Sequence, residues 1–137
     1  MKKDLILTGK IVSGAKQGAF FTKLDWFQEQ CLEQLGFRPY PGTLNIKVSI
    51  GNVPIIEALE KATKIDFIPP DSTFCSGKAV PVTAQGIRAA IVLPAAEVRV
   101  HGKDIIEVIA PVGLKEVLDV EDGDSITLIV NWERSEI

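Results

Sequence analysis

The segment "YPGTLNIKV", residues 40–48, combines a turn with polar side chains that could bind a metal ion. Pro41–Gly42 is typical of a tight turn, and the alternating apolar residues that follow predict a strand. Thr43 and Asn45 lie two positions apart, so their side chains point to the same face of that strand. Mg²⁺ accepts such uncharged oxygens when phosphates and water complete its shell. The segment therefore indicates either a magnesium site or the exposed polar face of a strand.

A second candidate is the loop within "VSGAKQGAFF", which Gly14 and Gly18 bracket. Glycines let backbone N–H groups approach a phosphate closely, and Lys16 between them adds a positive charge. The stretch lacks the lysine and hydroxyl that follow the second glycine in the Walker pattern GxxxxGK[ST]. Phosphate binding and an ordinary hairpin loop therefore both stay open for this segment.

The strand predicted around "DIIEVIA" carries a carboxylate in an apolar setting. Period-two alternation places Glu107 on the face of Ile105 and Ile109. A carboxylate among aliphatic side chains is costly unless it is paired or used. Glu107 could bind a polar group of a substrate or accept a proton from a hydroxyl, or it could face solvent on a half-buried strand.

The elements around these candidates predict a mainly β protein, an antiparallel barrel with short helices. Helices are expected at 24–36 and 52–63, with a shorter one at 112–120. In the first helix, we expect Asp25 to be the N-cap and Gly36 to end the helix. The predicted strands are Leu5–Ser13, Thr43–Ile50, Lys78–Thr83, Ile87–Pro94, Ile105–Ala110 and Ser125–Asn131. Short strands without βα alternation favour a barrel over a doubly wound sheet, and residues 1–137 are expected to form one domain.

Composition narrows the class of protein further. With 46% hydrophobic and 24% charged residues, the 137-residue chain can bury a sizeable core. The net charge of −3 argues against a nucleic-acid or anionic-membrane partner. Cys31 and Cys75 lack a metal-binding or disulfide pattern, and the N-terminal apolar run is broken too early for a signal peptide or membrane span. We therefore expect a cytoplasmic protein, and a local basic pocket for one phosphorylated small molecule stays possible. We also expect the protein to be a monomer.

The candidates occur in an order along the chain that resembles one known family. The relevant stretches are the glycine-bracketed loop after the first strand, "LGFRPYPGTLNIKV", "GIRAAIVLP" and "DIIEVIAPVGLKEVLDVEDGD". Together, from about Leu5 to Val130, they closely resemble the archaeal-type CTP-dependent riboflavin kinases. The resemblance implies a small six-stranded β-barrel of the cradle-loop kind. It also implies transfer of the γ-phosphate of CTP to the terminal ribityl hydroxyl of riboflavin, which gives FMN and CDP.

Carried over by position, the resemblance gives each candidate a role. Thr43 and Asn45 would hold Mg²⁺. Glu107 and Arg99 would contact the flavin, and Glu107 would also orient the attacking hydroxyl. That Glu107 acts as a base is a further hypothesis. The nucleotide CTP would lie between two segments: Gly14, Ala15, Lys16, Gln17, Gly18 and Ala19 in the first, and Val112, Gly113, Leu114 and Lys115 in the second. Phosphoryl transfer relies on positioning and charge neutralisation, so no catalytic triad is required.

Three positions depart from the family pattern and keep alternatives in view. Lys16 stands at the middle glycine of the nucleotide loop, and Ala19 stands where a basic residue is usual. Arg99 replaces a small hydroxyl that contacts the flavin. One alternative is therefore the same phosphate–metal site with a different acceptor or donor nucleotide, and another is a barrel that binds a flavin or nucleotide without turnover. A DNA-binding barrel is disfavoured by the acidic balance.

Overall fold

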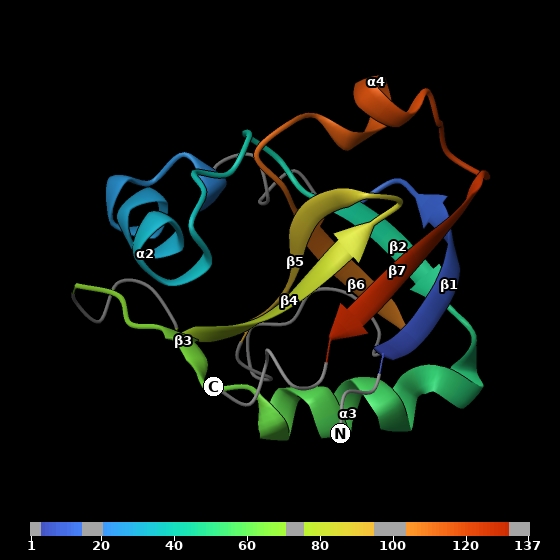
Figure 1. Cartoon of the computed structure of the whole chain (residues 1–137), viewed down its shortest axis with the longest axis horizontal. Coiled ribbons are helices and arrows are strands. Elements are labelled where there is room, and N and C mark those ends of the chain that lie inside the picture. The colour runs from blue at the N-terminus through green and yellow to red at the C-terminus, as the bar shows by residue number, and fades with distance from the viewer. Residues whose placement is uncertain (1–3, 15–20, 71–75, 95–103, 132–137) are drawn as a thin grey trace.

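The structure, a computed structural model, describes residues 4–14, 21–70, 76–94 and 104–131 (Figure 1). Its strands are β1 (Asp4–Val12), β2 (Leu44–Val48), β3 (Ile65–Phe67), β4 (Gly77–Ala84), β5 (Ile87–Pro94), β6 (Ile105–Ile109) and β7 (Ser125–Asn131). Its helices are α2 (Asp25–Leu35), α3 (Val53–Ala62) and α4 (Leu114–Leu118), with a 3₁₀ turn η1 at Ile50–Asn52. Within the described ranges, no helix has the length and apolar character needed to cross a membrane.

The strands close into an antiparallel barrel, which confirms the predicted fold. Their order is β3-β4-β5-β6-β2-β1-β7, and a further pairing of β4 with β7 closes a ring of six strands. Strand β3 lies outside this ring because the first part of β4 pairs with β3, whereas residues 82–84 pair with β7. β3 was not predicted, since three residues are too few to show a period. β2 stops at Val48 instead of continuing to Ile50, where η1 begins.

Alternation along the strands fills the barrel interior with aliphatic side chains. Leu44, Ile46 and Val48 of β2 are at most 6% exposed, as the apolar pattern of this strand predicted. They pack with side chains of the other barrel strands and with Ile56 and Leu59 of α3. Figure 1 shows α3 across one end of the barrel and α4 at the opposite end. Burial of this apolar surface is the main force that holds the barrel closed.

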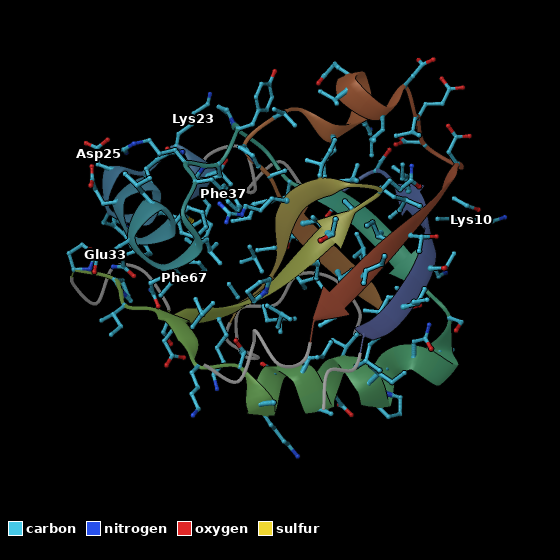
Figure 2. The ribbon with its side chains drawn as sticks, in the orientation of Figure 1. Lys10, Lys23, Asp25, Glu33, Phe37 and Phe67 are labelled. Carbon is cyan, nitrogen blue, oxygen red and sulfur yellow. The ribbon has the colours of Figure 1, made fainter. Side chains whose placement is uncertain are left out.

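Helix α2 packs on the outside of the barrel, against β4, β5 and β6. Phe27 is fully buried there, and its ring centroid lies 4.7 Å from that of Phe67. Figure 2 shows Phe37 and Phe67 on the side of α2 that faces the sheet, whereas Asp25 and Glu33 point away from it. The aromatic cluster therefore fixes the position from which the chain leaves α2 and enters the turn before β2.

The two ends of α2 test the predicted caps. Gly36 ends the helix as expected, with φ of 81° and its N–H donating to the carbonyls of Cys31 and Leu32. The prediction that Asp25 is the N-cap is wrong, because the helix begins at Asp25 and Leu24 occupies the cap. A carboxylate in the first turn interacts favourably with the helix dipole, much as one at the cap does. The two positions therefore give the same sequence signal.

Candidate functional site

Strand pairing brings three of the predicted site residues together. Asn45 of β2 is the register partner of Val12 on β1 and of Glu107 on β6. Thr43, which directly precedes β2, donates a hydrogen bond of 2.9 Å from Oγ1 to Oε1 of Glu107. Glu107 lies on the face of Ile105 and Ile109, as the alternation predicted, and it is half-buried. The carboxylate is therefore held by a hydroxyl from the residue that precedes the neighbouring strand.

Asn45 is buried, with only 6% of its surface exposed. Its Nδ2 lies 3.5 Å from the Thr43 carbonyl oxygen, at the limit of a hydrogen bond. Its Oδ1 is buried and has no hydrogen-bond partner among the described residues. The alternative of an exposed polar face therefore fails at Asn45, although it describes Lys47, which is exposed on the same face of β2.

Gly14 approaches this amide so closely that only a glycine fits. A Cβ added at Gly14 would collide with the Asn45 side chain, including Nδ2 and Oδ1. The first residue of the predicted nucleotide loop is therefore packed directly on the predicted metal ligand. Residues 15–19 of that loop and Arg99 lie outside the described residues.

The donor set at this site suits a hard cation that brings other ligands with it. A buried amide oxygen without a proton donor is expensive unless something else satisfies it. The Thr43 hydroxyl uses its proton on Glu107, which leaves oxygen lone pairs to face a cation. Among the described residues, no group of three or more His, Cys, Asp or Glu side chains could hold a metal. Thr43 and Asn45 could hold Mg²⁺ only if phosphate and water completed the shell.

The turn that presents Thr43 is held by contacts that the sequence did not reveal. The Gly42 N–H donates to Oγ1 of Thr22 at 2.7 Å, and Tyr40 N–H donates to the Ala110 carbonyl at 2.7 Å. Gln28 Nε2 of α2 donates to the carbonyls of Pro39, at 2.9 Å, and Thr22, at 2.6 Å. These contacts connect segments distant in sequence, and no local motif marks Thr22 or Gln28.

A hollow of about 190 Å³ lies beside Thr43. It is lined by Tyr40, Pro41, Gly42, Thr43, Leu44, Val108, Val112, Gly113, Leu114, Lys115 and Glu116. The predicted nucleotide segment 112–115 and the predicted metal ligand Thr43 therefore face one space. A Cβ at Gly113 would displace the exposed Glu116 carboxylate and would approach the Tyr40 ring at 3.3 Å, so the Glu116 side chain lies directly over this glycine.

Asp122 joins the two ends of this site, and the sequence had suggested only a turn at "EDGD". Its Oδ1 accepts a hydrogen bond of 2.8 Å from Lys115 Nζ, and its Oδ2 accepts one of 2.5 Å from Ser13 Oγ. The hydrogen bond from Lys115 lowers the pKa of the Asp122 carboxyl most, and the hydrogen bond from Ser13 lowers it further. Figure 1 shows the end of β1 and the starts of β2 and β7 at the α4 end of the barrel. Ser13, which precedes Gly14, and Lys115 thus share one carboxylate.

A larger hollow, of about 440 Å³, lies between the C-terminal end of α2 and the outside of β4 and β5. None of the predicted site residues lines it. Its guanidinium group belongs to Arg88, whose Nη1 would lie 3.0 Å from a Cβ at Gly36. A cation at that place interacts favourably with the carbonyls at the end of α2. The charge of Arg88 therefore has a structural use that is independent of the site at α4.

The fold and the candidate site define a class of protein: a closed β-barrel with a hollow of mixed polar and apolar lining beside α4. The model of the CTP-dep_RFKase family, described as "Domain of unknown function DUF120", matches residues 11–130. The chain belongs to this family, as the resemblance of its motifs implied.

Curated relatives carry the name riboflavin kinase. The protein of Methanocella arvoryzae is 38% identical over 88% of this chain and 55% of its own length. That of Pyrobaculum islandicum is 39% identical over 93% of this chain and 61% of its own length. That of Thermococcus kodakarensis is 36% identical over 91% and 58%, respectively. The chain thus spans little more than half the length of these relatives.

Proposed function

We propose that this domain is a CTP-dependent riboflavin kinase, which transfers the γ-phosphate of CTP to riboflavin and yields FMN and CDP with Mg²⁺. The family description and the name shared by the relatives support the reaction class. The observation that carries the proposal is the 2.9 Å contact of Thr43 Oγ1 with Glu107 Oε1, beside the unpaired Oδ1 of Asn45. A hydroxyl, an amide oxygen and a carboxylate so close together suit a metal–phosphate group and a hydroxyl acceptor.

Thr43 and Asn45 would hold the metal ion through neutral oxygens. When bound, Mg²⁺ neutralises phosphate charge as the phosphoryl group is transferred. Because neither ligand is charged, most of the attraction for the ion must come from the phosphates. We therefore expect metal binding to depend on nucleotide.

The nucleotide would lie between the Gly14 loop and the segment before α4. Lys115 is one of the residues that line the hollow, and its ammonium group would offset phosphate charge. The missing side chain at Gly14 lets backbone come close to Asn45 and to a phosphate held there. Residues 15–19 would complete the loop around the phosphates, and residues 112–114 would form the wall of the nucleotide site.

Glu107 would orient the terminal hydroxyl of the ribityl chain. The oxygen of that hydroxyl forms a bond to the γ-phosphorus, while the bond from this phosphorus to the bridging oxygen of the departing CDP breaks. The hydroxyl proton leaves to Glu107 or to water. Thr43 bonds Oε1 of Glu107, so Oε2 is the oxygen we assign to the acceptor. Arg99 would contact the flavin or, as a cation, a phosphate.

Product formation tests the proposal. The purified protein is incubated with riboflavin, Mg²⁺ and CTP, with ATP in a parallel sample, and the flavins are separated by chromatography. We expect FMN to form with CTP but not with ATP. If FMN formed with ATP only, ATP and not CTP would be the phosphate donor. If folded protein forms no FMN but still binds Mg–CTP in calorimetry, a different acceptor or a non-catalytic binder takes the place of the kinase. If the folded protein neither forms FMN nor binds Mg–CTP, the assignment of the nucleotide site is wrong.

A further inference from the structure

The turn at residues 121–124 is fastened to the end of β1 by backbone contacts. Gly123 N–H donates to the Ile11 carbonyl at 2.8 Å, and Ile11 N–H donates to the Asp124 carbonyl at 2.9 Å. Within the turn, Oδ2 of Asp124 accepts a hydrogen bond of 2.8 Å from Glu121 N–H. These contacts position the backbone of Asp122 independently of its own side chain. The Asp122 carboxylate is thus presented from a fixed support.

The side-chain contacts of Asp122 are too exposed to be explained by stability. The side chains of Lys115 and Asp122 are 46% and 47% exposed. Ion pairs as exposed as this one contribute little to folding. What the pair does accomplish is to restrict Lys115, whose long side chain would otherwise move among many conformations. An ammonium group has three protons, so Lys115 can donate to Asp122 and still donate to another anion.

We propose that Asp122 is a positioning residue of the nucleotide site: it holds Lys115 and the Ser13–Gly14 segment in one arrangement before the nucleotide binds. The inference rests on the proposed function and adds a residue to it. Ordering a cationic side chain in advance lowers the entropy lost when a phosphate binds. Asp122 therefore acts on nucleotide affinity through Lys115 and does not touch the flavin or the transferred phosphate.

Asp122→Asn tests this inference because it keeps the shape and removes the charge. We expect the KM for CTP and the Kd for Mg–CDP in calorimetry to rise about fivefold, the scale of an exposed ion pair. The kcat and the KM for riboflavin should stay within about twofold of the wild type, since neither involves Lys115 positioning. Asp124→Asn is the matched control: it removes a carboxylate charge from the same turn but keeps an oxygen that can accept the Glu121 N–H. It should therefore leave the turn, the contact of Asp122 with Lys115 and the KM for CTP unchanged.

A double-mutant cycle separates positioning through Lys115 from a general effect of charge. In a Lys115→Met background, Asp122→Asn should change Mg–CDP affinity less than twofold, because the cationic side chain that it orders is gone and only the contact with Ser13 remains. An undiminished effect in that background would overturn the inference, as would a wild-type KM in Asp122→Asn or an equal loss in Asp124→Asn. If the wild-type protein forms FMN, each of those outcomes overturns only the inference about Asp122 and leaves the proposed function standing. Wild-type protein that neither forms FMN nor binds the nucleotide overturns both.

Discussion

Thr43 and Glu107 are 64 positions apart in sequence, yet the Oγ1 of the first donates a 2.9 Å hydrogen bond to Oε1 of the second. The contact exists because β2 and β6 are neighbours in the barrel and Asn45 pairs with Glu107. It places a hydroxyl from the turn before β2 on the carboxylate that we assign to the acceptor hydroxyl.

Thr43→Val should lower the rate of FMN formation by about 10- to 100-fold, because it removes both a proposed metal ligand and the hydrogen bond to Glu107. Valine has nearly the same shape, so the fold should persist. Lys47→Met is the control on the same face of β2, since Lys47 is exposed, and it should leave kcat unchanged. Steady-state kinetics of both variants check this, and equal losses in the two would argue against a special role of Thr43.

Glu107→Gln separates a catalytic base from a binding residue. The amide keeps an oxygen that can accept the hydrogen bond from the Thr43 hydroxyl, but it cannot take up a proton from the substrate. If Glu107 is the base, kcat should fall by about 100-fold or more while riboflavin affinity stays similar. Unchanged turnover together with tight flavin binding, measured by flavin fluorescence titration, would rule out a role of Glu107 as the catalytic base.

Gly14→Ala should destabilise the protein and abolish nucleotide binding, because the new methyl group collides with the Asn45 side chain. Overpacking of this kind costs about 1–3 kcal/mol of unfolding free energy. Urea denaturation checks the stability. Gly14→Ala/Asn45→Ala should recover most of the lost stability, since the colliding amide is absent, but not the Mg²⁺-dependent binding of CTP. Recovery of both would show that Asn45 has no part in binding the metal.

The contacts of Asp122 should break in acid. Hydrogen bonds from Lys115 and Ser13 hold the pKa of this carboxyl below its ordinary value of 3.8. A lowered pKa means that the carboxylate contributes stability above about pH 4, and that this contribution is lost as the pH falls through the folded-state pKa. Because the pair is exposed, wild type and Asp122→Asn should therefore differ only slightly in thermal stability at neutral pH, and this difference should disappear once acid has protonated Asp122. A difference that persists in acid would contradict the ionic contact.

Cys31 should be inert in the native state. It is fully buried, and burial raises the pKa of its thiol to about 12. At pH 8 only about one molecule in ten thousand would then carry the reactive thiolate. In a Cys75→Ser variant, iodoacetamide should leave the native protein unmodified and should label it rapidly in urea, as mass spectrometry would show. Rapid labelling of native protein would mean that α2 opens easily.

The sequence by itself determined the six strands of the barrel, the end of the first helix and the family. Alternation at Leu44, Ile46 and Val48 predicted the buried face of β2, because side chains on a strand point alternately to opposite faces. Gly36 marked the end of α2, because it adopts a positive φ with little strain. Both signals are local, so a short window of sequence carries them in full.

Only the tertiary structure decided the arrangement of the site. The strand pattern alone favoured an exposed position for Asn45. Its burial follows from β1 and β6 on its two sides and from Gly14 packed against its amide. The roles of Thr22 and Asp122 depend on partners brought close by the closing of the barrel. Strand pairing and barrel closure act between segments distant in sequence, and no local pattern records them.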